Sequence, residues 1–182
     1  MPEYTDKDLL HMFQDADKRH LAFNLLIRKH QQKLYFFVRR MVIDHSDADD
    51  VLQNVFIKIW HNLTSFREDA KFITWAYRIC VNESITFLKN KRLRSIISFS
   101  SLETQMLNTL NDDNYFEGSE IQKKLQQAII KLPEKQRAIF NMRYYDELSY
   151  EEISEILGTS VGALKASYHI AKEKIEKFVL NH

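Results

Sequence analysis

The feature that most constrains this chain is its shortage of the residues that make tight turns. Its 182 residues include three glycines and two prolines, and neither residue type occurs between Glu3 and Glu117. Strands joined by hairpins rely on these residues at their turns, so a β-sheet fold is disfavoured. A glycine-rich phosphate loop and a dinucleotide-binding fingerprint are excluded as well, because both need several closely spaced glycines. We therefore expect an all-α fold.

Apolar side chains recur at helical spacing through the first half of the chain. The segments that show this spacing span about 5–15, 21–41, 46–60 and 71–91. Ser46, with Asp49 three residues later, has the pattern of a helix N-cap and predicts the start of the third segment. Together these helices are long enough to form one helical bundle with its own core.

The helical spacing fades from Arg94 to Ser119, where serine, asparagine, aspartate and threonine accumulate. Such composition is typical of a linker. Four further helices are predicted beyond it, at about 120–131, 134–145, 150–157 and 161–179. The sequence therefore predicts two small helical domains, 1–93 and 120–182, joined by a flexible linker at 94–119.

Charge is distributed unevenly along the chain. Residues 20–102 carry 13 basic and 7 acidic side chains, 103–120 carry 5 acidic and no basic ones, and 121–182 carry 10 basic and 8 acidic ones. Two basic blocks that flank an acidic strip suit two modules that touch a polyanion and a connector that avoids it. Ordinary variation of surface charge would give the same pattern, so charge alone does not decide.

The single cysteine, Cys80, cannot form an internal disulfide, and the chain does not open with a basic and then apolar leader. No uncharged stretch approaches the roughly 20 residues that a membrane-spanning helix needs. We expect a soluble cytoplasmic protein that does not insert into membranes.

Residues 148–165 have the pattern of a helix-turn-helix. Ser149 and Glu152 form a capping box for the first helix, Gly158 suits the left-handed turn, and Ser160 caps the second helix. In a DNA-binding unit of this kind the second helix enters the major groove. Its outward residues are Ser160, Ala163, Lys165, Ser167 and His169. An ordinary helical hairpin would also have caps and a glycine, and it remains an alternative.

Three motifs resemble the sigma-70 family of RNA polymerase sigma factors. LPEKQR at 132–137, with the tyrosine pair at 144–145 and LSYEEI at 148–153, is similar to the promoter-binding C-terminal region of its extracytoplasmic-function (ECF) group. Residues 47–60 resemble the family's polymerase-binding helix, and residues 72–82 resemble its promoter-melting segment. The short linker points to the ECF group. The resemblance implies a sigma factor that binds core polymerase and directs promoter recognition, and it implies neither enzyme activity nor a cofactor.

The resemblance also assigns residues to partners. Asp50 and Gln53 would face the clamp coiled coil of the polymerase, with Asn54 beside them where the family usually has an acidic residue. Phe66, in the loop at 65–71, is either a stacking platform for an unpaired base or a core anchor, while Trp75 is assigned mainly to the core. The residues assigned to minus-10 DNA are Phe66, Arg67, Lys71, Thr74, Arg78, Asn82, Lys89, Lys91 and Arg92.

The second helix of the helix-turn-helix departs from the commonest family pattern, which has arginines near Ser167 and Ile170. Phosphate contacts at the minus-35 element are therefore expected from Lys165, His169 and Lys172. The partners that the resemblance implies are the clamp and flap of core polymerase, promoter DNA and an anti-sigma factor.

Two other classes of function are alternatives. For an enzyme, the seven histidines show no paired metal spacing and no nucleophile elbow is present. An operator-binding regulator could use the same helix-turn-helix, and it would bind duplex DNA tightly without polymerase. The segment around Asp50 and Gln53 favours the sigma factor, because an operator-binding protein has no use for it.

Overall fold

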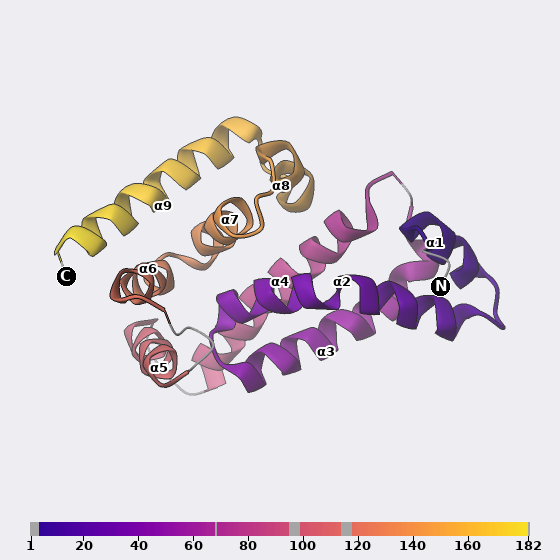
Figure 1. Cartoon of the computed structure of the whole chain (residues 1–182), viewed down its shortest axis with the longest axis horizontal. Helices are drawn as coiled ribbons and strands as arrows, with labels where there is room; N and C mark the ends of the chain where they lie inside the picture. The colour runs from indigo at the N-terminus through magenta and orange to yellow at the C-terminus, as the bar shows by residue number, and fades with distance from the viewer. Residues whose placement is uncertain (1–3, 68, 95–98, 114–117, 182) are drawn as a thin grey trace.

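The computed structural model describes residues 4–67, 69–94, 99–113 and 118–181, and over these residues it contains helices and no strands (Figure 1). The expectation of an all-α fold is therefore confirmed. In the same residues no helix is apolar over a length that would cross a membrane. The elements in chain order are α1 (Asp6–Gln14), α2 (Arg19–Val42), α3 (His45–Asn62), the 3-10 turn η1 (Leu63–Ser65), α4 (Phe72–Arg94), α5 (Phe99–Asp112), α6 (Glu120–Ile130), α7 (Glu134–Tyr144), α8 (Tyr150–Leu157) and α9 (Val161–Asn181).

The long helices α2, α3 and α4 pack side by side as a bundle, and α1 closes one end of it (Figure 1). Their apolar residues recur at helical spacing and turn inward. Burial of each large apolar side chain contributes roughly 1.5 to 3 kcal/mol, so this stripe is what holds the bundle together. The residues with no exposed surface include Leu34, Phe37, Val38, Met41, Val55, Ile59, Ala76, Tyr77 and Cys80.

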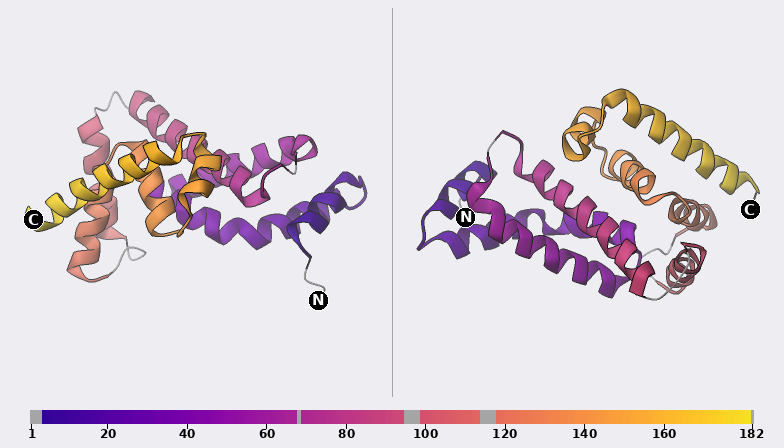
Figure 2. Two further views of the ribbon diagram at one scale, coloured as in Figure 1. Left: turned by 90° about the horizontal axis from the view of Figure 1, so that it is seen from above. Right: turned by 180° about the vertical axis from the view of Figure 1, so that it is seen from behind.

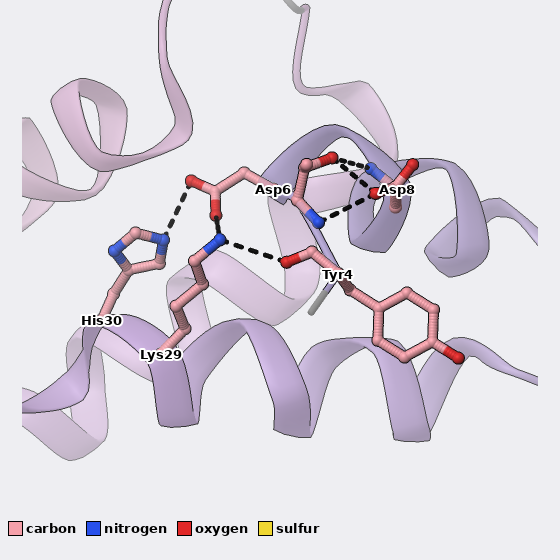
Figure 3. Close-up of polar contacts among 6 residues, drawn as sticks. Tyr4, Asp6, Asp8, Lys29 and His30 are labelled. Carbon is pink, nitrogen blue, oxygen red and sulfur yellow. Dashed lines mark hydrogen bonds and ion pairs between the residues drawn. The ribbon is translucent and has the colours of Figure 1, made fainter. Parts of the chain in front are cut away.

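Polar contacts attach α1 to α2 (Figure 3). Asp6 Oδ1 lies 2.9 Å from Lys29 Nζ, and Asp6 Oδ2 lies 2.9 Å from His30 Nε2. Burial acts to raise the pKa of Asp6, but the hydrogen bonds from Lys29 and His30 outweigh it, and the pKa lies below its usual value. Thr5 and Asp8 add a capping box at the start of α1. The first turn of α1 is therefore fixed both locally and against the bundle.

The start of α3 differs from the prediction. Its N-cap is Asp44 rather than Ser46: Asp47 N donates to Asp44 Oδ1 at 3.0 Å, while Ser46 Oγ itself donates to the same oxygen at 2.7 Å. Aspartate and serine are about equally good N-caps, so pattern alone could not choose between two positions this close together. Ile43, with a φ of 70°, turns the chain between α2 and α3 and puts Asp44 at the helix start.

The C-terminal domain consists of α6 to α9 and contains the predicted helix-turn-helix. The capping box of Ser149 and Glu152 is present, Gly158 has a left-handed φ of 64°, and Ala163 N donates to Ser160 Oγ at 3.3 Å. Ile153, Ile156 and Leu164 are buried between α8 and α9. All three local signals of the helix-turn-helix are therefore confirmed.

The segment predicted as a flexible linker contains a helix, α5. Its apolar residues Leu102, Met106 and Leu110 recur every four residues, are at most 5% exposed, and join the main core beside α6. Because most residues around these three are polar, the apolar face of α5 was not recognised in the sequence. Residues 95–98 and 114–117 of the predicted linker lie outside the described residues. The domain boundaries themselves stay a prediction.

The C-terminal helices lie along one side of the bundle, with α7 and α8 next to α2 and α4 (Figure 2). One cluster of buried apolar residues runs through both parts of the molecule and includes Ile139 and Met142 of α7 together with Met41 of α2. Arg137 of α7 is 3% exposed, and its Nη1 donates to Met41 O at 2.9 Å. The two domains are therefore packed against each other in this structure.

We expect Ser149→Ala to lower the free energy of unfolding by about 1 kcal/mol, because it removes the cap of α8. Ser46→Ala is the matched control and should change it by less than about 0.5 kcal/mol, since Asp44 caps α3. Urea unfolding followed by circular dichroism measures both. Equal losses for the two variants would contradict the cap assignments.

The capping box also gives a pH dependence. A hydrogen bond from the Ser149 backbone lowers the pKa of Glu152. A group whose pKa is lowered by folding stabilises the fold above its unfolded pKa, and this contribution is lost as the pH falls through the folded pKa. The stability difference between wild type and Glu152→Gln should therefore be present at neutral pH and fade in acid. A difference that grew on acidification would contradict this sign.

Candidate nucleic-acid interface

The residues assigned to polymerase binding lie together on α3. Asp50, Gln53 and Asn54 are all exposed. Asp50 and Gln53 line a groove of about 890 Å³ between α2 and α3, and all three line a second groove of about 460 Å³ between α3 and α4. We call these three side chains the polymerase surface. Phe56 and Trp60 are half-buried and pack against the core, and Trp60 lies with its ring centroid 5.4 and 5.0 Å from those of Phe13 and Phe23.

The opposite wall of the larger groove comes from α2 and was missed by sequence reasoning. Arg28, Gln31, Gln32 and Tyr35 line it. Their spacing of three and four residues is that of one helix face, so the signal was present in the sequence. The packing of α2 beside α3 is what places this face opposite Asp50 and Gln53. The groove therefore offers carboxylate, amide, guanidinium and hydroxyl groups to a partner.

The loop after η1 forms a pocket with α4. Phe66 lies 4.9 Å from Trp75 between ring centroids, with an angle of 38° between the rings. Both rings line a pocket of about 510 Å³, together with Arg67, Thr74 and Arg78. Phe66 is half-buried, so it both anchors the loop and presents part of its ring to the pocket. Lys71 is exposed beside the loop, and Glu68 lies outside the described residues.

Trp75 was assigned mainly to the core, and it does pack against the buried core cluster, while its half-buried ring also lines the pocket. The assignment of Thr74 needs correction. Thr74 was assigned to minus-10 DNA together with Arg78 and Asn82, which are four and eight residues further along the helix, but it is only 5% exposed. A spacing of four residues fixes a shared face, and the packing of neighbouring elements decides how much of that face is covered.

Arg78 is exposed, but its guanidinium also donates to backbone carbonyls of the same chain. Its Nε donates to Ile156 O at 3.0 Å, and its Nη2 donates to Glu155 O, both near the end of α8. Asn82, one turn further along α4, is exposed. The predicted minus-10 face of α4 is thus partly occupied by the helix-turn-helix of the same chain.

The basic end of α4 is also engaged within the molecule. Lys91 pairs with Asp47 at 2.5 Å, and Arg92 pairs with Glu134 at 2.5 Å. Burial raises the pKa of Asp47 although Lys91 opposes the shift. Lys89 is exposed. We call Phe66, Arg67, Lys71, Thr74, Arg78, Asn82, Lys89, Lys91 and Arg92 together the minus-10 surface.

The second helix of the helix-turn-helix, α9, carries most of its predicted DNA-facing residues on an open face. Ser167 is the exception, since it is half-buried and lines a groove towards α4 and α7. Glu173 lies 3.3 Å from His169 and Glu176 lies 3.7 Å from Lys172, so carboxylates accompany these two groups. The exposed members of the predicted set are Ser160, Ala163, Lys165, His169 and Lys172.

Lys165 has an aromatic support that sequence reasoning missed. Its Nζ lies 5.8 Å from the centroid of the Tyr150 ring, and the guanidinium carbon of Arg143 lies 5.2 Å from the same ring. A ring face attracts cations at this range. Tyr150 thus gathers two positive charges next to the start of α9, which makes Arg143 a further candidate for phosphate contact.

Comparisons with known proteins fit this geometry. The family described as sigma-70 region 2 matches residues 26–94, and the family described as sigma-70, region 4 matches residues 122–175. RNA polymerase sigma-H factor of Pseudomonas aeruginosa is 33% identical over 193 residues, which cover 97% of this chain and 95% of that protein. ECF RNA polymerase sigma-E factor of Escherichia coli is 34% identical over 185 residues, which cover 97% and 95% of the two chains.

Solved structures show the same fold. CnrH in complex with the cytosolic domain of CnrY aligns with a TM-score of 0.67 at 22% identity, over 96% of both chains. Sigma factor RpoE in complex with the anti-sigma factor NepR from Bartonella quintana aligns with a TM-score of 0.65 at 17% identity, over 86% of this chain and 96% of that one.

Two helical domains with a helix-turn-helix in the second, matched region by region, define a sigma-70 type transcription initiation protein. The chain belongs to the ECF group of the sigma-70 family.

We expect Lys165→Ala to weaken binding to a mixed-sequence DNA duplex and to reduce the slope of log affinity against log salt by about 0.9, the value for one phosphate contact. Lys177→Ala removes the same charge near the far end of α9 and is the matched control. Fluorescence anisotropy titrations over a series of salt concentrations measure the slopes. If both variants keep the wild-type slope, Lys165 does not contact phosphate.

Proposed function

We propose that this chain is an ECF sigma factor that binds core RNA polymerase and directs it to promoters. One observation carries the proposal: a single chain combines the exposed polymerase surface on α3, an aromatic pocket at the start of α4, and a helix-turn-helix. The rival, an operator-binding regulator, accounts only for the last of these. Because polymerase works on the chromosome, the proposal also places the protein in the cytoplasm.

The groove between α2 and α3 suits a helical partner with basic and polar side chains. Asp50 and Asp49 supply charge on one wall, and Gln53 supplies an amide. A charged acceptor makes shorter and stronger hydrogen bonds than a neutral one. We assign this groove to the clamp coiled coil of polymerase. We assign the C-terminal domain to the flap of polymerase. Asn54, which replaces an acidic residue usual in the family, provides a weaker contact.

The pocket of Phe66 and Trp75 supplies a way to open DNA without hydrolysing a nucleotide. A protein melts a duplex passively when it binds the unpaired strand better than the paired one. A base that leaves the stack can enter a pocket, and stacking on an aromatic ring is worth roughly 1 to 3 kcal/mol per base. Arg67 and Lys71, both exposed beside the pocket, would hold the phosphates of that strand.

Recognition of the minus-35 element is assigned to α9. The N-terminal part of such a helix enters the major groove, where Ser160 and Ala163 are exposed. Lys165, His169 and Lys172 would contact phosphates. His169 and Lys172 each have a glutamate one turn away, so we assign the main charge contact to Lys165.

The structures of CnrH and RpoE that share this fold contain a second protein, which for RpoE is an anti-sigma factor. We infer by likeness that an anti-sigma factor also controls this chain. The experiment that tests the main proposal is in vitro transcription with core polymerase and a genomic promoter library. New start sites that depend on the added chain are the expected result, and their absence together with no binding to core would refute the proposal.

Asp50→Ala and Gln53→Ala should each weaken binding to core polymerase by about fivefold or more, because each removes a polar contact from the centre of the polymerase surface. Asp17→Ala, an exposed carboxylate on the turn before α2, is the matched control. Calorimetric titration into core polymerase measures the affinities. Wild-type affinity for both groove variants would remove α3 from the interface.

Phe66→Ala should slow formation of the open complex by about fivefold to a hundredfold, which corresponds to the loss of one base stack. Phe66→Tyr keeps the ring and should remain close to wild type. Permanganate footprinting of the holoenzyme on a promoter from the library reports melting, and thermal unfolding reports the anchoring role. If Phe66→Ala lowers thermal stability but melts DNA normally, the ring serves only the core.

A further inference from the structure

We propose that Asp6 of α1 and His30 of α2 are positioning residues for the pocket of about 510 Å³ beside Phe66 and Trp75, which we call the base pocket. Neither residue is part of its lining. The inference rests on the proposed function, because that function assigns the pocket to an unpaired base. It follows from the Asp6–His30 pair, from the packing of His30 on Phe72, and from the packing of Phe72 on both aromatic rings of the pocket.

The Asp6 carboxylate fixes how the His30 ring lies (Figure 3). Its Oδ2 is 2.9 Å from His30 Nε2, and the His30 side chain is only 15% exposed. Although burial opposes the shift, hydrogen bonds from Lys29 and His30 keep the pKa of Asp6 below its usual value, so the carboxylate is ionised at neutral pH. An ionised carboxylate only accepts hydrogen bonds, so Nε2 must carry a hydrogen. The pair therefore holds the ring in one orientation.

The oriented ring packs on Phe72, the first residue of α4. The two ring centroids are 5.3 Å apart, and the planes of the rings make an angle of 45°. Phe72 is 2% exposed. A side chain this enclosed moves only when its neighbours move, because protein interiors are closely packed. His30 thus helps to set the position of the Phe72 ring.

Phe72 in turn supports both aromatic rings of the base pocket. Its ring centroid lies 6.4 Å from that of Phe66 and 6.1 Å from that of Trp75, with interplanar angles of 85° and 58°. The energy of an aromatic pair depends on the angle between the rings as well as on the distance. A shift of Phe72 therefore alters the surface that Phe66 and Trp75 present to a base.

Helix α1 also contacts the other end of the loop that carries Phe66. It packs against the 3-10 turn η1, where the Leu63 carbonyl accepts a hydrogen bond from Phe66 N at 3.3 Å. Leu63 is 1% exposed. The loop is therefore held by α1 directly at η1, and through His30 and Phe72 at the start of α4.

A purely structural role for Asp6 and His30 predicts a different result from a positioning role. If the pair only stabilises the bundle, its loss weakens binding to every DNA by the same factor. If the pair positions the base pocket, the loss depends on whether a base is there to enter the pocket. Removing the base from the DNA therefore separates the two roles.

The first test uses holoenzyme assembled from core polymerase and the full chain. The probes are a fluorescein-labelled single strand with the minus-10 sequence of a promoter that the chain recognises, and the same strand with one base at a time replaced by an abasic site. The captured base is the one whose removal costs wild type most. Asp6→Ala and His30→Ala should bind the intact strand about two- to tenfold more weakly than wild type, the effect of one aromatic pair. On the strand without the captured base they should equal wild type.

Two further variants are the controls. Asp6→Asn keeps a side-chain oxygen that can accept from His30 Nε2, so it should bind like wild type. Lys29→Ala removes the other partner of Asp6, which is 43% exposed, and should change the affinity by less than about twofold. A loss for Asp6→Ala that is equal on intact and abasic strands, or no larger than that of Lys29→Ala, would overturn the proposal.

A second test needs no polymerase. Trp60→Phe leaves Trp75 as the sole tryptophan of the full chain, so its fluorescence reports on the base pocket. Adding His30→Ala or Asp6→Ala should shift the Trp75 emission and raise its quenching by acrylamide, whereas adding Lys29→Ala should not. Far-UV circular dichroism identifies any variant that unfolds, and Asp6→Ala, at a partly exposed position, serves if His30→Ala does. An unchanged Trp75 signal in the folded variants would refute the positioning role.

The outcome for the positioning residues is separate from the outcome for the proposed function. A Trp75 signal that responds to Asp6 and His30, in a chain that never binds core polymerase, would refute the sigma assignment and leave the positioning role standing. Normal transcription together with a Trp75 signal that ignores both residues would do the reverse.

Discussion

The arrangement of the two domains depends on one buried cation, Arg137. A buried guanidinium is tolerated only when acceptors meet its donors. Here they are carbonyls near the ends of two helices, Met41 O at the end of α2 and Ile130 O at the end of α6. Both carbonyls lie where a helix runs out of internal partners. Burial lowers the pKa of Arg137 to about 10, so the group is still charged at neutral pH. This contact and the shared apolar core hold α7 on the bundle, and the short connections beyond α7 bring the helix-turn-helix to α4.

Features that a local rule determines could be predicted from the sequence. The capping box at Ser149 and the left-handed Gly158 are both set by residues within one turn, and both were found where predicted. Features that depend on the path of the chain or on packing against another helix were not predicted. Asp44 rather than Ser46 caps α3 because the chain turns at Ile43, and α5 forms because Leu102 and its neighbours meet an apolar surface that the sequence does not display. Thr74 is buried for the same reason, since helical spacing fixes relative direction but not what lies opposite.

Only part of each candidate surface could be predicted from the sequence. Asp50 and Gln53 came from a resemblance to a known helix, and the structure adds the α2 wall with Arg28 and Tyr35 that makes their neighbourhood a groove. No sequence pattern showed that Tyr150 would gather Arg143 and Lys165, because the three residues lie on three different helices. Family membership fixes the order of the surfaces along the chain. Which side chains are open, and which are held by the chain itself, follows from packing alone.

The position of Cys80 has a consequence for handling and for measurement. This thiol has no exposed surface, and burial raises its pKa, so the reactive thiolate is suppressed twice over. The folded chain should therefore resist alkylation and oxidation at its sole cysteine. Because no part of this side chain is exposed, the rate of thiol labelling measures how often the core around α4 opens. Cys80 therefore reports opening of the core without an engineered probe.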